Sequence, residues 1–78
     1  MPHIKVQMLK GRTEEQKSNL AETLAKVLTE TLNAAASHVS VSIEDYTAQE
    51  WQTVFKEEIT DKPDTLRIAP QYNPKTLL

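Results

Sequence analysis

Several residue types and segment types are missing from this sequence of 78 residues, and each absence excludes a class of structure. Without cysteine, neither a disulfide nor a thiolate metal site can stabilise the fold. The two histidines, His3 and His38, lie far apart in the chain, so we predict no metal site from them. No apolar run approaches the ~20 residues of a membrane span, and no basic run indicates a nucleic-acid partner.

The size and charge of the chain are those of one small domain over residues 1–78. A chain of this length buries only about 60–65% of the surface that it exposes when unfolded. Because no disulfide or metal compensates, oligomerisation is the usual remedy. A net charge of −2 and 26% charged residues are ordinary for a soluble protein. The first segment is too short and too polar for a signal peptide, so the expected location is the cytoplasm.

Two short stretches alternate apolar and polar residues with the period of a β-strand. Residues 2–9 place Ile4, Val6 and Met8 on one face, and residues 39–43 repeat the alternation. We therefore predict two strands, each with one buried face. Because a long helix is predicted between them, the strands should be parallel and the crossover right-handed.

The segment between the strands has the features of a capped amphipathic helix. Apolar residues recur at helical spacing, which predicts a helix over residues 14–32. Thr13 is the expected N-cap, with Gln16 completing a capping box, and Asn33 is an acceptable stop. The only glycine, Gly11, is expected to adopt a backbone angle that a side chain would resist.

After the second strand, shorter elements are predicted. Residues 45–47 should form a turn, and residues 48–59 a second helix whose apolar stripe begins at Trp51. The remaining prolines exclude a long helix in the tail. We therefore predict an extended tail with a short strand near residues 66–68.

A two-stranded sheet under one long helix has two open edges. Two copies would form a four-stranded sheet under two helices, an α+β architecture of two layers. The other sheet face carries polar side chains, which would be awkward to bury in a large apolar interface. These side chains are Lys5, Gln7, Ser40, Ser42 and Glu44. We therefore predict a homodimer, with a homohexamer as the alternative.

A proline at position 2, an alternating strand up to Leu9 and the segment Gly11-Arg12-Thr13-Glu14-Glu15-Gln16-Lys17 follow one another without interruption. The long helix, the second strand and Trp51 come next at compatible spacing. Over roughly residues 2–60 this pattern resembles the 4-oxalocrotonate tautomerase family. The resemblance implies a tautomerase/MIF-like fold, in which β-α-β protomers pair into dimers that stay dimeric or assemble into hexamers.

The resemblance also implies a function. In that family the initiator methionine is removed, and the amine of the proline, here Pro2, is the general base in keto–enol tautomerisation of 2-oxo acids. Arg12 is then the candidate for binding the substrate carboxylate, and Trp51 for lining the pocket. The implied enzyme is an isomerase without cofactor or metal, and its partner is a small 2-oxo acid or enol.

These residue types suit such chemistry. A base for this reaction must be neutral near pH 7 and a useful acid once protonated. An α-amino group has a pKa of ~7.7–8.0, and an apolar pocket or a nearby Arg12 would lower it by disfavouring the ammonium form. The planar guanidinium of arginine can hold a carboxylate with two hydrogen bonds.

Ser40 departs from the family pattern. Hexameric members carry at that position an arginine that polarises the substrate carbonyl. The departure argues against a dicarboxylate substrate, and the tail is similar to that of the dimeric subgroup, whose members accept monocarboxylate enols such as phenylpyruvate-type compounds. The group that polarises the carbonyl stays open among Ser40, a backbone N–H, Tyr46 and Tyr72.

Two alternative functions stay open. A protonated Pro2 can serve as the acid in water addition, as in hydratase and dehalogenase relatives, with Glu44 or Asp45 as the candidates for activating water. The chain can also be a non-catalytic oligomeric module of the same fold. If Met1 is retained, the nitrogen of Pro2 is an amide without a basic lone pair, and proline chemistry is excluded.

Overall fold

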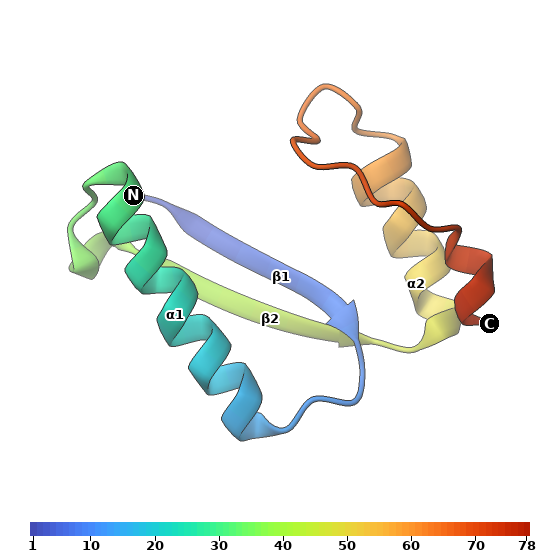
Figure 1. Ribbon diagram of the computed structural model, residues 1–78, viewed down its shortest axis with the longest axis horizontal. Helices are drawn as coiled ribbons and strands as arrows, with labels where there is room; N and C mark the ends of the chain where they lie inside the picture. Colours follow the sequence, from blue (N-terminus) through green and yellow to red (C-terminus); the bar gives the residue numbers. More distant parts are fainter. The chain divides into compact units, whose positions relative to one another are not determined.

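The computed structural model describes all residues, 1–78, which divide into two compact units, residues 1–45 and residues 46–78 (Figure 1). The elements in chain order are β1 (His3–Leu9), α1 (Glu14–Leu32), the 3₁₀ turn η1 (Ala36–His38), β2 (Ser40–Tyr46), α2 (Ala48–Phe55), the π-helical turn η2 (Lys56–Thr60) and the 3₁₀ turn η3 (Pro74–Leu77). The single domain over residues 1–78 stays a prediction.

The first unit is the β-α-β arrangement that the sequence predicts, and the α+β class is confirmed. β1 and β2 are neighbours in a two-stranded sheet and run in the same direction, with α1 alongside them (Figure 1). The amide of Ser40 donates a hydrogen bond to the carbonyl oxygen of Pro2 at 3.2 Å. In a parallel ladder this bond sets His3 directly opposite Ser40, so both side chains lie on one sheet face.

The ends of α1 are determined by the residues that flank it. Thr13 Oγ1 accepts from the amide of Gln16 at 3.1 Å, and Gln16 Oε1 accepts from the amide of Thr13 at 2.9 Å, so the capping box is confirmed. Asn33 ends the helix in the left-handed conformation, with φ 55°. Gly11 has φ 132°, and an added Cβ would meet no atom within 4 Å. Backbone angle alone, rather than crowding, therefore requires glycine there.

A single chain has very little interior. Val54 is the only buried apolar residue, at 9% exposure, and no large side chain is fully buried. On α1, Leu24 and Leu28 are half-buried, whereas Leu20 and Val27 remain 37% and 47% exposed. Apolar surface stabilises a fold by about 25 cal/mol per Å² only when it is removed from water. One copy therefore leaves much of this stabilisation unrealised.

The second unit is a short helix against which its own tail packs. Thr47 caps α2 through a second capping box with Glu50. Gln52 Nε2 donates to the carbonyl oxygen of Pro74 at 2.8 Å, beyond which the chain forms η3. The tail therefore folds back on α2, and it forms no regular element before η3. None of the helices is both long enough and apolar enough to cross a membrane.

The predicted turn at residues 45–47 is wrong. β2 begins one residue later than predicted and continues through Tyr46, so Asp45 belongs to the strand. Thr47 has extended backbone angles and is the N-cap of α2, so the strand passes directly into the helix cap. Turn-forming residue types misled the prediction, because Asp45 has a partner on α1 that stabilises it within the strand.

Two further boundaries differ from the predictions. Residues 66–68 form no strand, because a strand needs a hydrogen-bonded neighbour and the second unit contains no other strand. Ile68 is instead 87% exposed. The second helix keeps α geometry only to Phe55, and η2 continues it as a wider π-helical turn to Thr60.

Candidate functional site

Pro2 lies immediately before β1, at the edge of the first unit. Its side chain is half-buried, and its carbonyl oxygen is held by the amide of Ser40. Met1, by contrast, is 96% exposed and is therefore accessible for removal. While Met1 is present, the nitrogen of Pro2 is an amide. The base that the sequence predicts forms only when this bond is cleaved.

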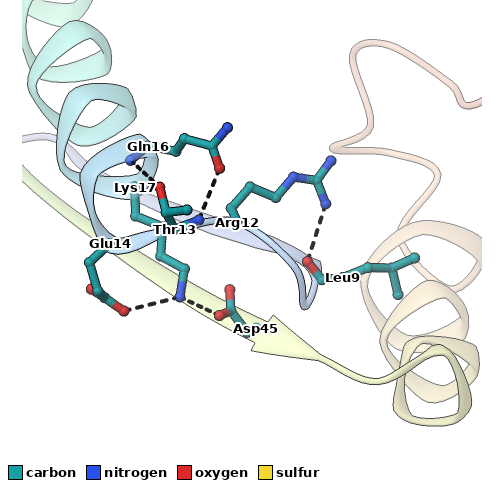
Figure 2. Close-up of polar contacts among 7 residues, drawn as sticks. All are labelled: Leu9, Arg12, Thr13, Glu14, Gln16, Lys17 and Asp45. Carbon is teal, nitrogen blue, oxygen red and sulfur yellow. Dashed lines mark hydrogen bonds and ion pairs between the residues drawn. The ribbon is translucent and has the colours of Figure 1, made fainter.

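Arg12 lies in the turn between β1 and α1, directly before the N-cap of the helix (Figure 2). Its side chain is exposed, and Nη1 donates to the carbonyl oxygen of Leu9 at 3.3 Å. No carboxylate of the chain pairs with this guanidinium. The contact to Leu9 holds the side chain over the end of β1 and leaves most of its N–H donors available to an anion.

An ion pair beside this turn ties the start of α1 to the end of β2. Lys17 Nζ donates to Asp45 Oδ2 and lies 3.5 Å from Glu14 Oε1 (Figure 2). The side chains of Lys17 and Asp45 are only 18% and 23% exposed. Their hydrogen bond, more than the attraction between their charges, raises the pKa of Lys17 above its ordinary value of 10.5. Sequence reasoning missed this pair.

Within one chain, Pro2 and Arg12 do not meet. Pro2 precedes the first residue of β1, and Arg12 follows the last, so the seven residues of the strand separate them. At about 3.3 Å per residue, the strand alone spans roughly 23 Å. A small 2-oxo acid cannot reach across this distance. A nearby arginine, which was expected to lower the pKa of the amine, is therefore not provided by the Arg12 of the same chain.

The polar face of the sheet carries a row of paired side chains. His3 Nδ1 lies 2.7 Å from Ser40 Oγ, and His3 Nε2 lies 3.3 Å from Ser42 Oγ. Further along the row, Lys5 Nζ pairs with Glu44 Oε1 at 2.8 Å. Alternation predicts that these residues share a face. It does not show that they pair, because this depends on the register of the two strands.

Trp51 belongs to an aromatic cluster in the second unit. Its indole Nε1–H donates to the hydroxyl oxygen of Tyr72 at 2.9 Å, and its ring lies 6.2 Å from the ring of Tyr46. The ring of Phe55 meets that of Tyr72 edge to face at 5.6 Å. Such contacts explain the half-buried state of Trp51 within its own unit. Its role in lining a pocket stays a prediction.

Comparisons with known proteins give one consistent result. The sequence profile of the family described as "Tautomerase enzyme" matches residues 2–61. A protein named "Probable tautomerase" from Xylella fastidiosa (strain 9a5c) is 37% identical over 73 residues, which cover 92% of this chain and 89% of that protein. The 2-hydroxymuconate tautomerase of Bacillus subtilis (strain 168) is 44% identical over 45 residues, which cover 58% of this chain and 73% of that protein.

Solved structures agree with the sequence comparisons. TomN, a 4-oxalocrotonate tautomerase homologue in the tomaymycin biosynthetic pathway, is similar with a TM-score of 0.62 and 32% identity. The similarity covers 64% of this chain and 77% of that chain. The family match begins at Pro2 and continues through η2, so it includes residues of both units.

Proposed function

The chain belongs to the tautomerase family, and we propose that it is a cofactor-independent keto–enol tautomerase of a 2-oxo acid, with Pro2 as general base. The observation that carries the proposal is the place of Pro2. It is the first residue of the family match, and it directly precedes β1.

The proposed reaction moves one proton. In ketonisation the enol hydroxyl loses a proton, the neighbouring carbon gains one, and the C=C bond is replaced by a C=O bond without net gain or loss of electrons. The neutral amine of Pro2 accepts the first proton and, as an ammonium, supplies the second. Arg12 binds the carboxylate of the substrate, and Trp51 lines the pocket.

A complete site needs more than one copy of the chain. Pro2 and Arg12 lie at opposite ends of a seven-residue strand, so one substrate can contact both only if they come from different copies. The thin interior of one chain supports the same conclusion. We propose that two copies join into a four-stranded sheet under two helices, as a homodimer. A homohexamer is the alternative, and a cytoplasmic location stays a prediction.

For the substrate we propose a monocarboxylate enol of the phenylenolpyruvate type. Arg12 has no acidic partner in the chain, so it is available for one carboxylate. At the start of β2 the chain offers Ser40 instead of a cation, and a second carboxylate would find no matching charge at that position. The similarity to a 2-hydroxymuconate tautomerase covers only 58% of this chain.

The contacts of two carboxylates argue against the hydratase alternative. Glu44 is paired with Lys5, and Asp45 with Lys17. In each pair one carboxylate oxygen is already held by a lysine ammonium group, so it is not available to a water molecule. The non-catalytic alternative applies to any molecule that retains Met1, since its Pro2 nitrogen is an amide.

The test compares the wild type with Pro2→Ala in the ketonisation of phenylenolpyruvate, followed by the loss of enol absorbance. Intact mass first establishes that Met1 is absent. General-base catalysis contributes roughly 10²- to 10⁴-fold. We expect a loss toward the lower end of this range, because the alanine of the variant still presents a primary amine at the start of the processed chain. Equal rates would refute the proposal.

Two controls accompany this assay. Pro63→Ala changes an exposed proline in the tail and should leave the rate unaltered. Wild-type protein whose intact mass includes Met1 should be inactive, because its Pro2 cannot accept a proton. Activity in that form would contradict the assignment of the base as directly as an active Pro2→Ala variant.

A further inference from the structure

His3, Ser40 and Ser42 form a hydrogen-bonded row beside the nitrogen-bearing end of β1. The bond from the amide of Ser40 to the carbonyl oxygen of Pro2 fixes β2 against this end of the chain. It also sets His3 opposite Ser40, and the His3 ring contacts both serine hydroxyls, at 2.7 Å and 3.3 Å. The row is exposed or half-exposed in the single chain, so a ligand can reach it.

We propose that the hydroxyl of Ser40 donates a hydrogen bond to the carbonyl or enol oxygen of the substrate, and that His3 positions this hydroxyl. The assignment rests on the proposed function of Pro2. Of the three side-chain donors that the sequence leaves open, Ser40 is the one whose backbone is hydrogen-bonded to Pro2 itself. It therefore belongs to the same rigid stretch of sheet as the base.

The chemistry of imidazole explains how His3 can prepare Ser40. A neutral histidine donates from one ring nitrogen and accepts at the other. When the hydrogen is on Nδ1, His3 donates to Ser40 Oγ and accepts from the hydroxyl of Ser42, and the hydroxyl hydrogen of Ser40 is free for the substrate. When it is on Nε2, the hydroxyl of Ser40 is used by His3. A substrate oxygen that accepts from Ser40 therefore selects the Nδ1–H form.

Side-chain substitutions separate this role from a purely structural one. We expect Ser40→Ala to lower kcat for phenylenolpyruvate roughly 10- to 100-fold, somewhat less than the loss of a donor in a closed oxyanion site. KM should stay within about threefold, because the bond strengthens as charge develops on oxygen. Ser40→Thr keeps the hydroxyl and should restore kcat.

Two substitutions of His3 distinguish its ring nitrogens. In His3→Asn the amide nitrogen can occupy the place of Nδ1 and still donate to Ser40, whereas in His3→Gln it falls near the place of Nε2. We expect His3→Asn to retain more of kcat than His3→Gln. The reverse order, or equal losses, contradicts positioning through Nδ1. Ser42→Ala, which removes the more distant contact, should have the smallest effect.

A spectroscopic measurement tests the same idea apart from the rate. In a His38→Gln background, the ring nitrogens of His3 give the only histidine signals in a ¹⁵N spectrum. Saturating phenylpyruvate should shift the ring toward the Nδ1–H form, and Ser40→Ala should abolish the shift. An unchanged or opposite tautomer overturns the assignment.

The outcomes also separate this assignment from the proposed function. If Pro2→Ala loses activity while Ser40→Ala keeps kcat within about threefold of the wild type, Ser40 is excluded and the role of Pro2 stands. If the wild type does not ketonise the enol, the proposed function fails, and the role of Ser40 fails with it.

Discussion

Mixing two impaired variants, Pro2→Ala and Arg12→Ala, should restore activity above that of either variant alone. The reason is the length of β1, whose seven residues place the two side chains roughly 23 Å apart in one chain. If each site combines Pro2 of one copy with Arg12 of another, a mixed dimer contains one site with both residues intact. The second site of that dimer lacks both.

The size of the recovery follows from the symmetry of a dimer. Random exchange of equal amounts gives half mixed dimers, each with one working site of two, so about a quarter of the wild-type activity should return. The residual activity of the two variants must be low for the recovered activity to be visible. Loss of a charge-assisted hydrogen bond costs about 1.5–3 kcal/mol, which lowers kcat/KM of Arg12→Ala roughly 10- to 100-fold.

The assay is ketonisation of phenylenolpyruvate at low substrate concentration, after the variants have exchanged and native mass has shown mixed dimers. Lys10→Ala removes another exposed cation of the same turn and should stay near wild-type activity. Mixing Pro2→Ala with the double variant should restore nothing. If mixed dimers form and are no more active than the mean of their parents, Pro2 and Arg12 do not share a site between copies.

Two further predictions concern stability and are measured by urea unfolding. Because the Asp45 carboxylate raises the pKa of Lys17, the pair stabilises the fold fully below pH 10.5 and loses this effect as pH rises through the folded-state pKa. Lys17→Met should therefore be less stable than the wild type near neutral pH and should approach the stability of the wild type at higher pH. Lys26→Met, which replaces an exposed lysine without an ion pair, should alter the stability little. A difference in stability between Lys17→Met and the wild type that is independent of pH would contradict this. Thr13→Ala removes the acceptor for the amide of Gln16 and should lower the free energy of unfolding by about 1 kcal/mol. Thr23→Ala changes an exposed threonine within α1 and should not lower this free energy. Equal losses in the two variants would argue against the cap.

The sequence predicts α1 best, because every signal there is local. A capping box at Thr13, acidic residues in the first turn and Asn33 at the end all act within a few residues of the backbone that they affect. The predicted bounds, residues 14–32, are those of the structure. Elements whose ends depend on distant partners are predicted less well, as β2 and residues 66–68 illustrate.

The candidate site could be predicted only one residue at a time. Pro2 and Arg12 stand out by type and spacing, yet the strand between them already implies that they lie far apart. The row of His3, Ser40 and Ser42 depends on the register of two strands 37 residues apart in the chain, which alternation does not specify. Because these polar side chains are already hydrogen-bonded to one another, burying the polar sheet face in an interface costs less free energy than burying unpaired polar groups.

Asp45 shows how a missed contact can be found. It continues the alternation of Val41 and Ile43, so it lies on the strand face that α1 covers, and Lys17 begins the half-buried stripe of α1. A carboxylate on such a face is stable only with a partner, and a lysine in such a stripe has the same need. Each of these two residues therefore indicates that the other is its partner.

Asp45 Oδ1 is nevertheless buried without a hydrogen bond, which opposes part of the stabilisation from Oδ2. The pair is better explained by what it fixes: it holds the first turn of α1, and with it the Arg12 turn, against the end of β2.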